Sequence, residues 1–303
     1  MRPWDAELVV DEALARRLLR QFPDVEIHSL DPIAEGWDRA IWLVNGELGF
    51  GFPRRAIAVP GIQREIEWLP RLAPLLPLPI PVPAFVGRPS EEFPWPFFGS
   101  PFLPGVEVAE AGLDARARLD VALEVAAFLR RLHSPEVTAT LDADALPVDA
   151  NARADMTKRA PIVRLSLEEL ERAAIWCTPD VVRRVLADAE RLPPSRERLV
   201  VAHGDLHFRH LLVADARASG VIDWVDLCRA DPAIDLQLVW SFLPPDDRDA
   251  FLAAYGPVTE EQLLRARVIA LSLGAALASY AHAERMPSIE REAVAGLERA
   301  AIG

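Results

Sequence analysis

Cysteine and lysine are nearly absent from this sequence of 303 residues. The two cysteines, Cys177 and Cys228, are too few for a disulfide framework, and their spacing fits no zinc finger. Lys158 is the only lysine among the 33 lysine and arginine residues. Any site that needs a positive side chain elsewhere in the chain must therefore use arginine.

Positive charge is outnumbered as well. The 33 lysine and arginine residues face 46 aspartate and glutamate residues, which gives a net charge of −13. Such a chain is repelled by the phosphates of nucleic acids, so we expect no nucleic-acid partner. No apolar run approaches the roughly 20 residues that span a membrane, and residues 1–5 do not resemble a signal peptide. These absences predict a cytoplasmic protein without membrane contact. We expect a monomer or a dimer.

The length exceeds what one compact core usually holds, and the chain divides into two regions. In the first hundred residues, two apolar runs flank Asn45-Gly46, a pair that favours the positive φ angles of a tight hairpin turn. Alternation and periodicity predict further elements in this region, namely strands over residues 24–34, 82–87 and 97–103 and helices over 5–22 and 62–75. The first region is therefore expected to be rich in β-structure.

From about residue 114 onward, the apolar residues recur at helical spacing. One long helix is expected to end near His133, two more are expected within residues 150–191, and helices return over 232–300. Short apolar strands interrupt this pattern between residues 200 and 223. The whole chain is therefore predicted to have an α+β fold with a mainly helical second region.

The interrupting segment carries the residues with the clearest chemistry. An apolar strand runs into a loop of sequence His203-Gly204-Asp205-Leu206-His207-Phe208-Arg209-His210, and a later apolar strand ends in Ile222-Asp223-Trp224. Two carboxylates and several imidazoles on adjacent elements can position a metal ion together with a general base. Two kinds of chemistry fit these residue types.

The first is hydrolysis at a zinc site. Its ligands would come from the histidines and carboxylates of both segments, namely His203, Asp205, His207, His210 and Asp223. This interpretation requires residues 203, 205 and 207 to point the same way along a strand, whereas Gly204 favours a loop.

The second is phosphoryl transfer, which depends on positioned charges and a metal ion more than on covalent work by the protein. Asp205 would accept the proton of the attacking hydroxyl. Asp223 would hold Mg²⁺ on the phosphates of a nucleotide, and His210, five residues after the base, would hold the same ion. This interpretation uses more of the chain than the zinc site does.

Several motifs resemble the aminoglycoside phosphotransferase family of small-molecule kinases. The catalytic loop of that family reads approximately H-G-D-L-H-P-G-N and its metal-binding strand reads I-D-W, and the chain has His203–His210 and Ile222–Trp224 at these places. Further segments are similar to family motifs, namely Gly36-Trp37-Asp38, Phe52-Pro53-Arg54-Arg55 and Asp231-Pro232-Ala233-Ile234-Asp235-Leu236. The resemblance covers most of residues 30–255.

The resemblance implies the two-lobed protein-kinase-like fold, with a β-rich N-terminal lobe over residues 1–101 and a mainly helical C-terminal lobe over 102–303. It implies that ATP or GTP binds between the lobes with Mg²⁺, and that a small-molecule alcohol accepts the phosphoryl group. In this comparison Asp205 is the catalytic base, and His210 and Asp223 are the metal ligands. The nucleotide would be contacted by Gly36, Arg54, Glu65, Ser100 and Phe102, with its base near residues 99–103.

Two positions depart from the family pattern. His210 stands where the family usually has asparagine. The macrolide phosphotransferases, a subgroup of the family, resemble this chain in having histidine there. Because imidazole is a softer ligand than an amide oxygen, Mn²⁺ is an alternative to Mg²⁺. Gly51 stands where the family has a lysine or arginine that binds the nucleotide phosphates. In the family this cation also pairs with a glutamate on a helix, and Glu65 stands at the place of that helical glutamate. The candidates to replace that cation are Arg39, Arg54 and Arg55.

The predicted function is an ATP- or GTP-dependent phosphotransferase that modifies a hydroxyl of a small molecule, with aminoglycoside and macrolide antibiotics as the suggested acceptors. Gly51 keeps open an alternative, a nucleotide-binding pseudo-kinase with a regulatory or scaffolding role. Neighbouring residues are expected to be structural. His203 and His207 would hold the loop by hydrogen bonds, Asp231 would cap a helix, and Asp235 would anchor the loop.

Overall fold

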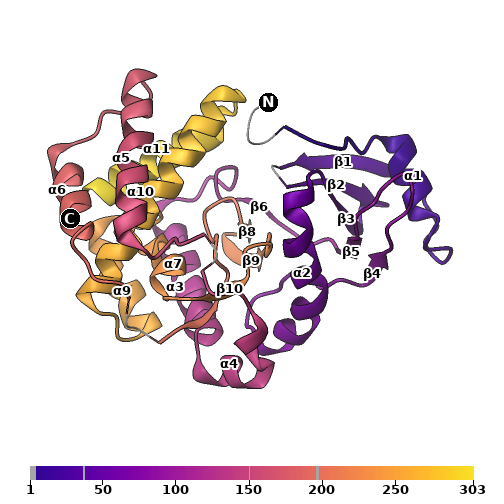
Figure 1. Ribbon diagram of the computed structural model, residues 1–303, viewed down its shortest axis with the longest axis horizontal. Coiled ribbons are helices and arrows are strands. Elements are labelled where there is room, and N and C mark those ends of the chain that lie inside the picture. Colours follow the sequence, from indigo (N-terminus) through magenta and orange to yellow (C-terminus); the bar gives the residue numbers. More distant parts are fainter. Residues whose placement is uncertain (1–4, 37, 150, 196–197) are drawn as a thin grey trace. The chain divides into compact units, whose positions relative to one another are not determined.

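The computed structural model describes residues 5–36, 38–149, 151–195 and 198–303, and the chain forms two compact units (Figure 1). The first unit comprises Met1–Leu75, Pro79–Pro104 and Val221–Asp226, and the second comprises Leu76–Leu78, Gly105–Gly220 and Leu227–Gly303. The first unit thus extends to Pro104 rather than ending at residue 101. It also includes the segment around Asp223, which is distant in sequence.

The first unit is built on an antiparallel sheet of five strands in the order β1-β2-β3-β5-β4. The strands are β1 (Leu30–Glu35), β2 (Arg39–Val44), β3 (Leu48–Pro53), β4 (Phe85–Gly87) and β5 (Phe97–Pro101). Asn45 and Gly46 form the β2–β3 turn with φ angles of 55° and 72°, as the sequence predicts. The strand predicted over 82–87 begins only at Phe85, because the prolines before it have no N–H to donate to a sheet. The strand predicted over 24–34 begins only at Leu30.

β3 shows the difference between the two faces of this sheet. Phe50 and Phe52 lie on one face, where they are fully buried in a core shared with helix α1 (Glu12–Leu19). Because side chains alternate along a strand, the intervening Gly49 and Gly51 lie on the opposite face. At these two positions β3 contributes no side chain to that face, which leaves room for side chains from neighbouring segments.

Helix α2 (Val59–Leu72) follows a short 3-10 turn at Ala56–Ala58. It begins at Val59 rather than at residue 62, and Pro60 stands in its first turn, where a helix does not use the missing N–H. Glu65 lies on its buried face and is completely inaccessible to solvent. A buried carboxylate is unfavourable unless it is paired, so Glu65 needs a positively charged partner within the first unit.

The second unit is mainly helical, as predicted. Its helices are α3 (Ala115–Leu132), α4 (Pro135–Leu141), α5 (Met156–Arg172), α6 (Asp180–Ala189), α7 (Ala233–Leu236), α8 (Leu238–Ser241), α9 (Pro245–Tyr255), α10 (Glu260–Ala283) and α11 (Pro287–Ala301). α10 packs against α5, α6, α7, α8 and α11 and forms the centre of this unit.

α10 differs from the expectation that no apolar segment is long enough to span a membrane. By length and composition alone it is apolar enough to cross a membrane. Most of it is buried against the other helices of the unit. A buried core helix has the same composition as a spanning helix, so this feature is weak evidence for a membrane span.

Two short sheets frame the loop that carries Asp205. β7 (Val200–Ala202) pairs with β10 (Cys228–Ala230), and β8 (Leu211–Ala214) lies between β6 (Val106–Glu107) and β9 (Arg217–Val221). The loop therefore starts at the end of β7 and ends at the start of β8. β6 and β10 are not predicted from the sequence, because strands this short do not show an alternating pattern.

Candidate active site

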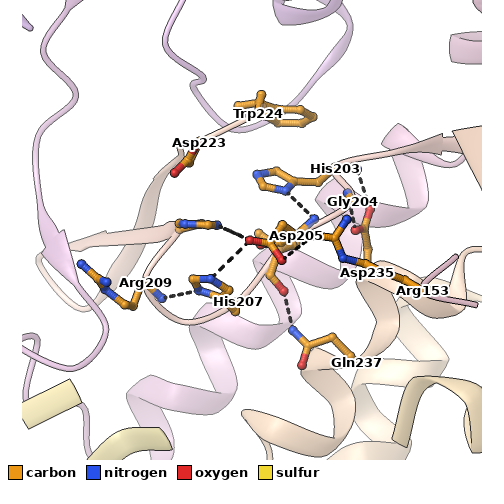
Figure 2. Close-up of polar contacts among 12 residues, drawn as sticks. Arg153, His203, Gly204, Asp205, His207, Arg209, Asp223, Trp224, Asp235 and Gln237 are labelled. Carbon is orange, nitrogen blue, oxygen red and sulfur yellow. Dashed lines mark hydrogen bonds and ion pairs between the residues drawn. The ribbon is translucent and has the colours of Figure 1, made fainter. Parts of the chain in front are cut away.

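The loop between β7 and β8 holds Asp205 in the second unit (Figure 2). The chain leaves the buried strand through Gly204, whose φ of 90° favours glycine. His203 is completely buried, whereas the side chain of Asp205 is 20% exposed. A partly exposed carboxylate on a fixed loop is suited to act as a general base.

Asp235 of α7 anchors this loop. One of its oxygens accepts a hydrogen bond from the N–H of His203 at 2.8 Å, and the other accepts one from Gly204 at 3.0 Å. His133, at the end of α3, contacts the same carboxylate through Nε2 at 3.1 Å. Burial raises the pKa of Asp235, but His133 and the loop amides outweigh burial, so the pKa lies below its usual value. The expectation that Asp235 anchors the loop is confirmed.

Further contacts hold the rest of the loop. Gln237 donates a hydrogen bond to the carbonyl of Leu206 (Figure 2). In both His203 and His207, Nδ1 accepts the N–H of the residue two positions later, at 3.3 Å. Asp231 accepts the N–H of the first residue of α7 at 2.9 Å. The structural roles expected for the two histidines are therefore confirmed. Asp231 precedes the N-cap of α7, which is Pro232, so it bonds the start of the helix without being the N-cap residue itself.

The carboxylate of Asp205 has charged and polar neighbours. Nη2 of Arg153 lies 3.2 Å from its Oδ1, while Nε2 of His207 lies 3.6 Å and Nδ1 of His210 lies 3.9 Å from its Oδ2. Arg153 comes 52 residues earlier in the chain, in the segment before α5. No motif indicates it, so sequence reasoning missed this positive neighbour of the base.

His210 is oriented by the same loop. Its Nδ1 lies 2.8 Å from the carbonyl oxygen of Asp205, so Nδ1 carries the hydrogen and Nε2 carries the lone pair. Metal-binding histidines in proteins commonly have this second nitrogen bonded to a carbonyl or carboxylate. His210 thus has the tautomer that a metal ligand needs, and ligation itself stays a prediction.

A zinc site in this loop fits less well. Ligand atoms of Asp205, His207 and His210 lie within 4.8 Å of one another. However, Nδ1 of His207 accepts a backbone hydrogen bond, so the hydrogen of this ring is on Nε2, the nitrogen that faces Asp205. Burial lowers the pKa of His207 well below its usual value, which keeps the ring neutral. Because a protonated Nε2 cannot bind a metal, this arrangement argues against a metallohydrolase.

In the first unit, Glu65 of α2 forms an ion pair with Arg39, the first residue of β2. The other oxygen of Glu65 accepts the N–H of Trp224 at 3.0 Å. Burial raises the pKa of Glu65 to about 7, although Arg39 pulls it down. Nη2 of Arg39 also lies 3.3 Å from Oδ1 of Asp223. One guanidinium therefore contacts both the predicted helical glutamate and the predicted metal ligand of this unit.

The other two arginine candidates bind the loop between β1 and β2. Arg54 donates a hydrogen bond to the carbonyl of Gly36, and Arg55 forms an ion pair with Asp38. Both contacts tie the end of β3 to this loop. Trp37, the middle residue of the predicted glycine-loop motif, lies outside the described residues. Contact of Gly36 and Arg54 with a nucleotide stays a prediction.

Ser100 and Phe102, expected near the nucleotide base, lie at the end of β5 and just after it. Ser100 is buried, whereas Phe102 is 43% exposed. The N–H of Phe102 donates to the carbonyl of Glu47 at 2.7 Å, and its ring lies 3.5 Å from the place that a Cβ of Gly49 would occupy. Phe102 therefore uses the face of β3 on which the glycines lie.

Comparison with known proteins supports the resemblance. Residues 29–268 match the phosphotransferase enzyme family. An aminoglycoside 3'-phosphotransferase of Streptomyces fradiae is 29% identical over 205 residues, which are 66% of this chain and 70% of that protein.

Solved structures extend the comparison to the fold. The GDP and kanamycin complex of APH(2")-IIia is similar at a TM-score of 0.69 and 21% identity, over 96% of this chain and 98% of that one. A macrolide 2'-phosphotransferase, MphH from Brachybacterium faecium, is similar at a TM-score of 0.61 and 22% identity, over 94% and 98%. These similarities confirm the two-lobed kinase-like fold. Since the family match covers well over half of its residues, the chain belongs to the phosphotransferase enzyme family.

Proposed function

We propose that the protein transfers the terminal phosphoryl group of a nucleoside triphosphate to a hydroxyl of a small molecule. The observation that carries this proposal is the loop of Asp205, a partly exposed carboxylate whose backbone is held by Asp235. Asp205 would accept the proton of the hydroxyl as its oxygen attacks phosphorus. Beyond this base, the reaction requires that the hydroxyl and the phosphoryl group are held in position and that the negative charge of the phosphates is compensated.

Features of the first unit support nucleotide binding. The face of β3 that lacks side chains at Gly49 and Gly51 has Phe102 beside the first glycine and Arg39 beside the second. An exposed aromatic ring can stack on a purine, and a guanidinium can bind phosphate oxygens in pairs. The GDP complex of the similar APH(2")-IIia makes GTP a candidate donor beside ATP.

The donor set of the predicted metal ligands fits a divalent cation. When bound, Mg²⁺ or Mn²⁺ would compensate the negative charge of the phosphates. Asp223 offers hard carboxylate oxygens, which suit Mg²⁺. His210 offers the lone pair of Nε2, a softer donor that suits Mn²⁺ better than an amide oxygen does.

The proposed acceptors are aminoglycoside and macrolide antibiotics, the classes in the names of the similar proteins. Arg153 supports a preference between them, because its guanidinium lies 3.2 Å from the carboxylate of the base. A fixed positive charge at that place repels a polycation such as an aminoglycoside. A macrolide carries fewer amino groups and is therefore the preferred candidate.

A nucleotide-binding pseudo-kinase is the second candidate, because Gly51 lacks the cation of the family pattern. The pair between Arg39 and Glu65 counts against it, since the helical glutamate has a positive partner from another strand. The two candidates differ in one property. An enzyme consumes nucleotide when the acceptor is present, and a pseudo-kinase only binds it.

Asp205→Asn tests the proposal. The substitution preserves size and removes the base, so affinity for Mg²⁺–ATP and Mg²⁺–GTP should stay unchanged. Acceptor-dependent nucleotide consumption should fall by roughly 10²–10⁴-fold, the usual worth of a general base. Calorimetry gives the affinities, and a nucleotide-consumption assay with macrolides and aminoglycosides gives the rates. Asp188→Asn, on the exposed surface of α6, is the matched control.

Two outcomes would contradict the proposal. Near-full turnover by Asp205→Asn would remove Asp205 from the mechanism. A wild-type protein that binds nucleotide but shows no turnover with any acceptor would favour the pseudo-kinase.

A further inference from the structure

We propose that Arg39 of β2 is the cation that binds the nucleotide phosphates, and that it replaces the lysine or arginine expected at position 51 of β3. The inference rests on the proposed nucleotide-dependent function and assigns one of its binding residues. It explains the departure from the family pattern at Gly51 by a single exchange between neighbouring strands, in which Arg39 supplies the cation.

The register of the sheet puts Arg39 and position 51 on one face. Ile41 is the direct partner of Gly51 in the β2–β3 ladder, and Arg39 lies two residues before Ile41, on the same side of the strand. A Cβ on Gly51 would lie 3.3 Å from Cδ of Arg39 and 3.6 Å from its Nη1. The arginine side chain therefore runs diagonally over the glycine and occupies the space that a side chain at position 51 would fill.

Arg39 also makes the contacts expected of the missing cation. Its guanidinium pairs with Glu65, which is completely buried, and Nη2 lies 3.3 Å from the carboxylate of Asp223. On the other side, the guanidinium carbon lies 5.7 Å from the ring centre of Phe98, the β5 partner of Gly51. A cation beside the helical glutamate and the predicted metal ligand is placed where the phosphates of a metal-bound nucleotide need one.

The glycine at position 51 and the arginine at position 39 depend on each other physically. A buried carboxylate without a positive partner is strongly unfavourable, so a chain that loses the cation at position 51 needs another one for Glu65. Arg39 can serve only if its path over β3 is clear, and glycine is the residue that clears it. Arginine has five N–H donors in a planar fork, so it can pair with Glu65 and still bind phosphate oxygens.

The test uses Arg39→Ala, Gly51→Arg and the double variant, with affinities for Mg²⁺–ATP, Mg²⁺–GTP and the nucleosides adenosine and guanosine. Arg39→Ala should weaken triphosphate binding by roughly 10- to 100-fold, the worth of a charged hydrogen bond. Gly51→Arg should also weaken it, because two guanidinium groups then compete for one space and one glutamate. The double variant moves the cation back to β3 and should restore triphosphate affinity to within about threefold of wild type.

Nucleoside affinity separates phosphate binding from a structural role. The nucleosides lack phosphates, so their affinities should be the same in wild type and in all three variants. Arg17→Ala is the control, since it removes an arginine of the same unit that pairs with Glu92 on the exposed surface. If Arg39→Ala does not fold, Arg39→Ala combined with Glu65→Gln removes the unpaired buried charge and should show the same selective loss.

Three results would overturn the inference. Unchanged triphosphate affinity in Arg39→Ala, with wild type active, would show that another group binds the phosphates while the proposed function stands. Equal losses for nucleosides and triphosphates would show that Arg39 acts only through the fold. A wild-type protein that binds no triphosphate would overturn the proposed function together with this inference.

Discussion

At the scale of single residues, hydrogen bonds decide which atoms of the catalytic loop can do chemistry. His207 and His210 are three residues apart and their rings stack with centroids 3.8 Å apart. Nδ1 of His207 accepts a backbone N–H, whereas Nδ1 of His210 faces a backbone carbonyl and must donate. Of these two histidines, His210 is therefore the one with its lone pair on Nε2, and it is the one suited to bind a metal through that atom.

His210→Asn should shift the metal preference of nucleotide binding from Mn²⁺ toward Mg²⁺, because an amide oxygen is a harder ligand than imidazole. We expect the ratio of Mn²⁺ to Mg²⁺ affinity to fall by roughly tenfold, the lower end of the range for substitutions around a metal site. Titration of nucleotide binding with each metal measures it. His282→Asn, a half-exposed histidine of α10, serves as the control. The same preference in wild type and His210→Asn would show that His210 is not a ligand.

The sequence predicts the roles of residues that belong to local motifs, such as Asp205 and Asp223. It does not predict the roles of residues whose partners are close in space but distant along the chain. Arg39 meets Glu65 across 26 positions, and Arg153 meets Asp205 across 52. From the sequence Arg39 is one of three candidates for the cation and Arg153 is not indicated. Both assignments depend on how strands and loops pack, which no local pattern records.

At the scale of secondary-structure elements, one carboxylate ties together segments that are distant in sequence. Asp235 of α7 binds the loop after β7 and His133 at the end of α3. Nδ1 of His133 in turn contacts the hydroxyl of Tyr255, at the end of α9, at 2.8 Å. The position of the proposed base therefore depends on helices that contribute no residue to the chemistry.

Asp235→Asn should reveal this anchor as pH-dependent stability. The folded protein lowers the pKa of Asp235, so its contribution is complete above the unfolded value of about 3.9 and is lost as pH falls through the lower folded value. At neutral pH the variant should be less stable by about 2–3 kcal/mol, because an amide cannot accept from all three donors. Urea unfolding between pH 3 and 7 measures the difference. It should shrink below about pH 4, and a constant difference would show that the charge of Asp235 does not contribute.

The elements themselves are predictable where their pattern is long or their turn chemistry is specific. The β2–β3 hairpin follows from Asn45-Gly46, and the long α3 follows from its periodicity. The start of β4 is not predicted correctly because prolines replace the alternating pattern before it. β6 is not predicted because a strand of two residues is too short to show an alternating pattern. Those short elements matter nonetheless, since β6 pairs with β8 at the end of the catalytic loop.

At the scale of the whole molecule, the two units carry different parts of the proposed reaction. The first has the aromatic ring, the guanidinium and the carboxylate expected of a nucleotide site, and the second has the proposed base. The scarcity of lysine explains why the cation is arginine. Lys158, the only lysine, lies on α5 of the second unit and pairs with Asp155.

The most direct test of the proposed function is the identity of the product. The purified protein is incubated with Mg²⁺, ATP or GTP and each member of a panel of macrolides and aminoglycosides, and the acceptors are analysed by mass spectrometry. We predict that wild type adds one phosphoryl group to a hydroxyl of an acceptor, with macrolides favoured, and that Asp205→Asn does not. Nucleotide consumption without any phosphorylated acceptor, or equal product from Asp205→Asn, would contradict the proposed function.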